Sequence, residues 1–248
     1  MRATEVQQSQ PVERTPDQII GRYQASHRWR LYEKEWLYRN YPPAGHTWLD
    51  FGCGTGEITT QLALLGATRV IGIDVFPELL DMTRRRAALD GVSDRVDLFC
   101  GDVSALEPQQ VDVVLCYAVL HHLTDRLPEV LSALLRWLKP GGVLLIVEPV
   151  CYLQWMEWLR QRSGIAYGAL DPGERKLTRQ EIRHLQDRFL YCDQAHFHLF
   201  ARLSRIWPTA DRMFRRLDRV TLSVPGMWRF AGTAVLAGEV KSGIPADQ

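Results

Sequence analysis

The fold is decided by the stretch Thr47-Trp48-Leu49-Asp50-Phe51-Gly52-Cys53-Gly54-Thr55-Gly56, in which a short apolar run leads into three glycines. The segment 57–65 that follows has helical spacing and stops at Gly66. Glycines let the backbone turn tightly and approach a ligand closely, and the first N–H groups of a helix are free to bind it. A tight turn between a strand and a helix would also use such glycines. The rest of the chain is therefore needed to distinguish a ligand-binding loop from a plain turn.

Strands and helices alternate between residues 46 and 148. The expected strands after the first are continuous Val, Ile and Leu runs, and the helices between them end at glycines or turns. Runs of this kind are typical of a parallel sheet that is covered on both faces. We therefore expect an α/β, doubly wound fold with strands at 47–51, 69–74, 96–100, 111–117 and 143–148 and helices at 57–65, 77–89 and 125–138.

The alternation is absent from both ends of the chain. Aromatic residues recur at helical spacing over 17–41, which predicts an N-terminal helical cap. After residue 150 we expect helices at 152–162 and after Thr178, an arginine-rich amphipathic segment at 201–217, and a closing strand at 235–240. The predicted organisation is a flexible arm (1–16) and a single domain (17–248) made of a helical cap (17–45), a ligand-binding core (46–150) and a C-terminal helical lid with closing strands (151–248).

Composition excludes several classes of protein. The net charge is +1, and 46% of the residues are hydrophobic, as in an ordinary soluble domain. The N-terminus is polar and the apolar runs are short, so we expect a cytoplasmic protein with no integral membrane association. The cysteines form no C-x-x-C pair and are expected to be reduced, mostly buried thiols: Cys53, Cys100, Cys116, Cys151 and Cys192.

Charge and aromatic residues are unevenly distributed. Residues 1–150 carry a net charge of −4 and residues 151–248 a net charge of +5. Of the 24 aromatic residues, 18 lie outside 42–150. This imbalance indicates an apolar lid over a ligand cleft, although most of these rings are expected to pack helices onto the sheet.

Two carboxylates follow neighbouring strands of the predicted sheet. Asp74 comes 20 residues after Gly54, the position of an acid that grips ribose hydroxyls. Gly56 is followed by Glu57, so the G-x-G-x-x-G fingerprint of a dinucleotide site is absent, which disfavours an NAD-dependent oxidoreductase. Asp102 follows the third strand, where it would accept a hydrogen bond from an adenine amine or cap the next turn. The pattern predicts a site for a nucleoside without a diphosphate.

At this point the motifs resemble those of the class I S-adenosylmethionine-dependent methyltransferases of the small-molecule type. The resemblance covers residues 46–150 and rests on five motifs in the expected order: WLDFGCGTG, IGIDVF, FCGDV, VDVVLCYAVLHHL and LKPGGVLLIVEP. It implies a Rossmann-like sheet of seven mostly parallel strands with S-adenosylmethionine as the cofactor.

The resemblance also implies roles for single residues. Asp50 would orient the amino group of the cofactor's methionine part, and Asp74 would hold its ribose. Val75 and Phe76 would flank the adenine, while Asp102 and Val103 would read its amine. The amino-acid part would be lined by the loop residues Gly52, Cys53, Gly54 and Gly56.

The resemblance also implies that the segment after the fourth strand passes beside the sulfonium of the cofactor. Tyr117 and His121 are therefore the candidate catalytic residues, and Tyr117 would also contact the cofactor. Histidine is suited to remove a proton from a hydroxyl or an amine near neutral pH. His121 and His122 would alternatively cap or pack a helical turn. Methyl transfer needs mainly in-line approach and desolvation, so a dedicated base is not required.

The acceptor is expected to be a small hydrophobic or aromatic metabolite of secondary metabolism, methylated on O or N. We expect Tyr23, Tyr32, Trp155 and Tyr167 to enclose it. C-methylation of a quinone-like or prenyl acceptor is the near alternative, and a non-catalytic scaffold that keeps the cofactor fold is the alternative from another class. The sequence leaves the oligomeric state open.

No metal site and no nucleic-acid site are expected. His196 and His198 would face one side of a strand, but neither they nor His184 are joined by a cluster of carboxylates. The chain's pI of about 7.7 is low for a nucleic-acid-binding protein. The arginines after 201 are expected to form a solvated helix face, because Asp211 and Asp218 interrupt them. Attraction to an anionic acceptor or a membrane surface is the alternative.

Overall fold

A seven-stranded sheet with the order β3-β2-β1-β4-β5-β7-β6 organises the computed structural model, which describes residues 31–162 and 175–241. Only β7 runs antiparallel to its neighbours. This arrangement confirms the expected α/β class and the mostly parallel, Rossmann-like sheet. The strands are β1 (Thr47–Phe51), β2 (Arg69–Asp74), β3 (Val96–Cys100), β4 (Val111–Tyr117), β5 (Leu138–Pro149), β6 (Asp193–Phe197) and β7 (Thr233–Glu239).

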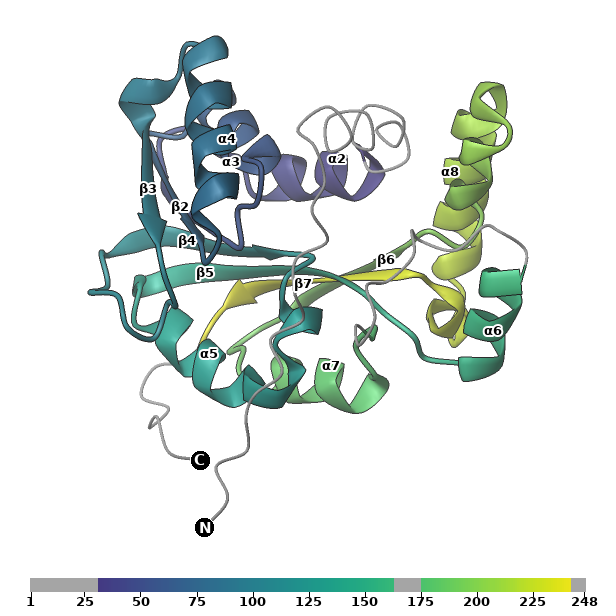
Figure 1. Cartoon of the computed structure of the whole chain (residues 1–248). Coiled ribbons are helices and arrows are strands. Elements are labelled where there is room, and N and C mark those ends of the chain that lie inside the picture. The colour runs from purple at the N-terminus through teal and green to yellow at the C-terminus, as the bar shows by residue number, and fades with distance from the viewer. Residues whose placement is uncertain (1–30, 163–174, 242–248) are drawn as a thin grey trace, which may run out of the picture.

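Helices cover both faces of this sheet (Figure 1). One face carries α2, α3 and α4, and the other carries α5 and α7, while α6 and α8 lie at the β6 end of the molecule. Their bounds are α2 (Leu31–Asn40), α3 (Glu57–Leu64), α4 (Pro77–Leu89), α5 (Leu127–Leu135), α6 (Gln154–Arg162), α7 (Arg179–Gln186) and α8 (Asp211–Leu222). The predicted arm and the first part of the predicted cap lie outside the described residues.

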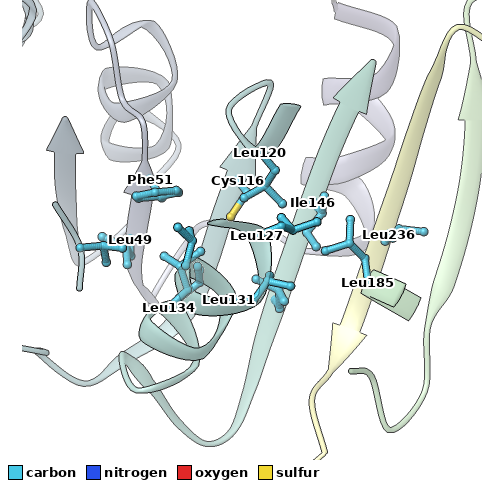
Figure 2. Close-up of a cluster of buried hydrophobic side chains, with 14 of the residues drawn as sticks. Leu49, Phe51, Cys116, Leu120, Leu127, Leu131, Leu134, Ile146, Leu185 and Leu236 are labelled. Atoms are coloured by element: carbon cyan, nitrogen blue, oxygen red, sulfur yellow. The ribbon is translucent and has the colours of Figure 1, made fainter. Parts of the chain in front are cut away.

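The central strands are buried on both faces, which explains their continuous apolar sequences. In β1, Trp48 points into the hydrophobic cluster under α2 and α3, and the next residue, Leu49, points into the opposite cluster. Figure 2 shows the second cluster, where Leu131 and Leu134 of α5 lie against β1 and β4. Successive strand residues point to opposite faces, so both must be apolar when both faces are covered.

Three expected boundaries are wrong. Helix α5 ends at Leu135, and β5 already begins at Leu138, because that residue pairs with Val111 before the register shifts between Leu138 and Val143. The segment 201–217 is not one helix. It contains two 3₁₀ turns, 201–205 and 208–210, and α8 starts only at Asp211. The break falls at Trp207, since a residue that precedes proline disfavours the helical conformation.

Some expected environments are also wrong. Cys100 is exposed, although the cysteines were expected to be mostly buried. Arg202 is buried rather than solvated, and its guanidinium donates a hydrogen bond to the Gly232 carbonyl at 3.1 Å. His196 and His198 do not share a side of the sheet edge: His196 lies against Tyr152, whereas a positive φ of 69° turns His198 toward α2.

Asp218 fastens α8 to the end of β6. This fully buried carboxylate accepts hydrogen bonds from the backbone N–H groups of four consecutive residues that follow β6, over 198–201, at distances from 2.5 to 3.3 Å. The turn after β6 therefore obtains its hydrogen-bond acceptor from a side chain instead of from backbone. A carboxylate that satisfies buried N–H groups holds them strongly, because each group left alone would lose its bond to water.

We predict that Asp218→Ala lowers the free energy of unfolding by roughly 3 kcal/mol or more, since four buried N–H groups lose their acceptor. Urea unfolding followed by circular dichroism measures the change. Asp81→Ala serves as the control, because Asp81 forms only an exposed ion pair with Arg84 and should cost less than about 1 kcal/mol. Equal effects of the two variants would contradict the anchoring role of Asp218.

Candidate cofactor and active site

The glycine loop lies at the carboxyl end of β1, between the sheet and α3. Gly52, Gly54 and Gly56 all have positive φ, at 71°, 54° and 76°. A Cβ at Gly52 would lie 2.4 Å from a methyl of Val119, and one at Gly56 would lie 2.4 Å from a methyl of Thr83. A Cβ at Gly54 would meet nothing within 4 Å. Gly52 and Gly56 are therefore required by packing, whereas Gly54 presents bare backbone to open space.

Asp74 holds this loop in place. It is the last residue of β2, and its carboxylate accepts hydrogen bonds from the Gly54 N–H at 2.8 Å and the Phe76 N–H at 3.0 Å. One side chain thus connects the loop after β1 to the start of α4. Its position at the carboxyl edge, beside Gly54, is the one that the sequence interpretation required of a ribose-binding acid.

Asp50 lies within the sheet, beneath the loop. Its carboxylate is buried and accepts a 2.6 Å hydrogen bond from the Thr59 hydroxyl of α3. Burial raises the pKa of Asp50 to about 6, although the bond from Thr59 opposes the shift. Cys53 is also buried, and burial raises the pKa of its thiol. The Cys53 thiol is therefore kept in its neutral form beside the loop.

The residues expected around the adenine differ in exposure. Val75 and Phe76 remain exposed to 56% and 44%, unusually high values for apolar side chains beside a buried strand end. Val103 is buried in the core. Asp102 accepts a hydrogen bond from the Ser104 N–H and another from Arg126, both at 2.8 Å. The Ser104 bond and then Arg126 lower the pKa of Asp102, so this carboxylate remains an ionised acceptor.

Tyr117 ends β4 and belongs to a buried chain of polar groups that crosses to α2. Its hydroxyl donates to Glu33, whose other carboxylate oxygen lies 3.0 Å from His198 Nε2. Nδ1 of His198 contacts the Thr233 hydroxyl at 2.9 Å. Burial alone would raise the pKa of Glu33, but His198 and the Tyr117 hydroxyl lower it overall. Tyr117 is thereby fixed by groups from α2, β6 and β7.

Glu33 and His198 are site residues that the sequence interpretation missed. Glu33 lies in a helix recognised by its aromatic spacing, and nothing in its local sequence separates it from a solvent-exposed glutamate. His198 was weighed as a metal ligand, and no metal site was expected there. Their contact depends on the fold, since 165 positions separate them in the chain.

His121 forms a second buried pair with a carboxylate. Its Nδ1 lies 2.8 Å from Glu148 of β5, and the other oxygen of Glu148 accepts hydrogen bonds from the N–H groups of Val119 and Leu120. His121 is 7% exposed and Glu148 is fully buried. Ala118, just before this turn, has a φ of 53°, which is strained for a residue with a side chain. Glu148 therefore fixes both the turn after β4 and the orientation of the imidazole.

The residues expected to enclose an acceptor have different environments. Tyr32 is buried, its ring contacts Phe197 edge to face at 4.9 Å, and its hydroxyl donates to the Arg215 carbonyl. It therefore packs α2 against β6 in this structure. Trp155 is 59% exposed. Tyr23 and Tyr167 lie outside the described residues.

Within residues 31–162 and 175–241 no group of three His, Cys, Asp or Glu side chains is arranged to hold a metal ion. His196, one of the histidines considered as a ligand, is largely buried beside Tyr152 and Trp228. Burial lowers the pKa of His196 to about 4, so the ring is neutral at physiological pH.

A family description, "Methyltransferase domain", matches residues 49–146. This segment contains the glycine loop, Asp74, Asp102, Tyr117 and the His121 turn. The chain carries a class I S-adenosylmethionine-dependent methyltransferase domain. The expected family and its cofactor, S-adenosylmethionine, are confirmed at this level.

Two relatives show how far sequence similarity extends. The ribosomal protein L11 methyltransferase of Photobacterium profundum is 37% identical over 112 residues, which are 45% of this chain and 36% of the relative. The ubiquinone biosynthesis O-methyltransferase of Thiobacillus denitrificans is 37% identical over 108 residues, 43% of this chain and 46% of the relative. The matches therefore cover less than half of these relatives.

Solved structures of methyltransferases extend the similarity of fold to most of the chain. A methyltransferase of Geobacter sulfurreducens in complex with S-adenosylhomocysteine has a TM-score of 0.54 at 21% identity, covering 85% of this chain and 91% of that one. Magnesium protoporphyrin IX methyltransferase of Synechocystis, also with S-adenosylhomocysteine, has a TM-score of 0.55 at 16% identity, covering 91% and 87%. The [4+2]-cyclase SpnF has a TM-score of 0.56 at 21% identity, covering 86% and 81%. At these identities the likeness concerns the fold alone.

The methyltransferase domain has a surface that fits its cofactor. Gly54 presents a backbone surface that any side chain would fill, Asp74 supplies a carboxylate next to it, and Asp50 lies buried beneath the loop. These residues would hold the ribose hydroxyls and the amino group, and the exposed Val75 and Phe76 would cover the adenine. The individual contacts are proposals, and two predictions test them.

We predict that Gly54→Ala weakens S-adenosylmethionine binding tenfold or more, about 1.4 kcal/mol, because the new methyl occupies the surface beside the cofactor. Isothermal titration calorimetry measures the affinity. Gly91→Ala is a matched control, because Gly91 also has a positive φ (67°) and open space around its Cβ position, but it lies at the far end of α4. Equal losses of affinity in both variants would attribute the effect to backbone strain instead.

Asp50 makes cofactor affinity depend on pH. Its free carboxyl binds a proton below its pKa of about 6, whereas a nearby ammonium group favours the ionised form. Binding below that pH must therefore release the proton, and affinity should fall by up to about tenfold per pH unit as the pH drops below 6. Asp50→Asn should bind more weakly at pH 7 and lose this slope, while the exposed Asp94→Asn keeps it. A slope that persists in Asp50→Asn would overturn the contact.

Proposed function

We propose that the protein is an S-adenosylmethionine-dependent methyltransferase that acts on O or N of a small hydrophobic or aromatic acceptor. The proposal rests on the arrangement at one edge of the sheet. There the Gly54 surface follows β1, Asp74 ends β2, and the Tyr117–His121 turn lies at the end of β4. The bound cofactor supplies an electrophilic methyl group, and transfer yields S-adenosylhomocysteine, the methylated acceptor and a proton.

The protein would contribute mainly by positioning the cofactor and the acceptor. In-line transfer requires the acceptor atom to approach the methyl group from the side opposite the sulfur, in a site without water. Asp50, Asp74 and the glycine loop would fix the cofactor. Tyr117 is held by Glu33, so its hydroxyl has a defined place beside the expected sulfonium position.

His121 would remove the proton of the acceptor. The geometry that supports this role is the contact between Nδ1 and Glu148. If Nδ1 carries the hydrogen and donates it to that carboxylate, Nε2 has a free lone pair, and the imidazolium formed on protonation is stabilised by the same carboxylate. Glu148 would then act as a positioning residue.

The two relatives are named for different classes of acceptor, so an experiment has to identify the acceptor of this protein. One relative is named for a quinone-pathway O-methylation, which favours a small acceptor, and C-methylation of a quinone-like or prenyl acceptor is the near alternative. Another is named for methylation of a ribosomal protein. A panel of phenols, aromatic amines, quinols and purified ribosomal proteins, assayed for S-adenosylhomocysteine formation, would separate these acceptors.

The competing class is a protein that keeps the fold without methyl transfer. SpnF, a structural neighbour by fold, is named as a cyclase, so the fold by itself does not define a reaction. Calorimetry with S-adenosylmethionine comes first. Absence of binding at millimolar concentration would overturn the methyltransferase proposal, and binding with turnover of a panel acceptor would support it.

With an accepted substrate in hand, we predict that His121→Asn lowers kcat by roughly 10²- to 10⁴-fold while the affinity for S-adenosylmethionine stays within about twofold. The matched variant is His122→Asn, because His122 is the neighbouring histidine of the same turn and its ring centroid lies 4.0 Å from that of His121. An unchanged kcat would show that positioning alone suffices and that no base is used.

A further inference from the structure

Large apolar side chains are exposed on α6, on α8 and on the 3₁₀ turns before α8, at one end of the molecule (Figure 1). Each of these side chains is between 43% and 70% exposed. A concentration of large exposed apolar side chains in one region is a common mark of a binding surface. We call it the α6–α8 surface; its members are Trp155, Trp158, Leu159, Ile206, Trp207, Met213, Leu217, Val220 and Val224.

Helix α8 provides the most regular part of this surface. Met213, Leu217 and Val220 follow one another at intervals of four and three residues, which places them in one stripe along the helix, and Val224 lies just beyond its end. The side that packs on the protein is a different one and carries Phe214 and Asp218, both buried. Helix α8 therefore has one apolar side for the core and a second apolar side that remains outside.

Arginines run beside the stripe without acids to neutralise them. At 100° per residue, Arg212, Arg216 and Arg219 lie along one flank of it, and all three are exposed. Asp218 is buried against backbone N–H groups, and Asp211 is paired with Arg215 at 2.8 Å. The acids that interrupt the arginines in the sequence thus point elsewhere. Among the described residues, Arg212 and Arg216 form no ion pair.

The helices of the α6–α8 surface follow strands that end at the same edge of the sheet as the glycine loop. Pro149, which ends β5, pairs with Thr233, and Thr233 pairs with Phe197, which ends β6. Helix α6 follows the first of these ends and the segment leading to α8 follows the other, as Figure 1 shows. Two pairs of aromatic rings connect this surface to the rest of the protein. The ring centroids of Trp155 and Phe230 are 6.4 Å apart, and so are those of Trp207 and Phe214.

We propose that the α6–α8 surface docks on the face of a lipid bilayer that contains anionic phospholipids. An amphipathic helix with an apolar stripe, flanking arginines and nearby tryptophans lies in the interface, with its apolar side among the acyl chains and its arginines at the phosphates. No helix in the described ranges is long and apolar enough to cross a membrane, so the association is peripheral. The proposal does not depend on methyl transfer.

Co-sedimentation of the full chain with vesicles tests the docking. Vesicles of phosphatidylcholine mixed with phosphatidylglycerol should retain the protein, and vesicles of phosphatidylcholine alone should retain at least about tenfold less. Added salt should weaken the binding, because the arginine contribution is screened. Equal binding to both vesicle types, or none to either, would overturn the proposal.

Variants separate the apolar and the charged contributions. Leu217→Glu combined with Val220→Glu should abolish binding, and Arg212→Glu combined with Arg216→Glu should weaken it at least about tenfold. Leu89→Glu is the matched control, since Leu89 is 88% exposed at the end of α4, far from the α6–α8 surface in sequence and element order. Circular dichroism verifies that each variant is folded. Loss of binding in Leu89→Glu to the same degree would contradict the assignment.

A second copy of the chain is the competing occupant. Light scattering coupled to size-exclusion chromatography measures the mass of the wild type and of the Leu217→Glu, Val220→Glu variant. A wild-type dimer that this variant converts to a monomer, together with no retention by anionic vesicles, would overturn the membrane proposal in favour of self-association. A monomer that binds anionic vesicles supports it.

Discussion

The carboxylate of Asp74 is the constraint on which the candidate site depends. It connects the Gly54 N–H and the Phe76 N–H, and so it holds the loop after β1 and the start of α4 at a fixed spacing. Three residues of the loop have positive φ, and Asp74 supplies the acceptor for the N–H of the middle one, Gly54. The same acid would have to serve ribose hydroxyls, so the loop and the nucleoside would share one acceptor. The remaining site residues are arranged around this fixed point, at the ends of β1, β3 and β4.

Two buried carboxylates extend the site toward the C-terminal part of the chain. Glu148 holds the turn that carries His121, and Glu33 connects Tyr117 to His198. Each is satisfied by donors from several elements, which is what burial of a charge requires. Consequently the expected catalytic side chains are fixed by α2, β5, β6 and β7, and the helices that would select an acceptor are physically connected to the groups that would act on it.

The sequence predicted the core of the fold well and its periphery poorly. Four strands and two helices between residues 47 and 117 follow from apolar runs and glycine punctuation. The pattern is local, and β1, β2 and β4 are buried on both faces. The start of β5 was misjudged because the pairing of Leu138 with Val111 is between residues distant in the sequence. The arginine segment was misjudged because its acids face inward: Asp218 binds backbone and Asp211 pairs with Arg215, which no spacing rule reveals.

The sequence by itself determined the class of fold and a site for a nucleoside, because glycines and carboxylates at strand ends must recur at fixed intervals to serve a shared ligand. The family and the cofactor came from the resemblance of its five motifs to the class I methyltransferases. Only the tertiary structure decided which groups stand next to one another across the chain. Glu33 and His198, His121 and Glu148, and the four N–H groups on Asp218 meet because the sheet brings separate segments to one edge. The tertiary structure also decided that α8 keeps an apolar stripe outside, since the direction a helix faces depends on what its other side packs against.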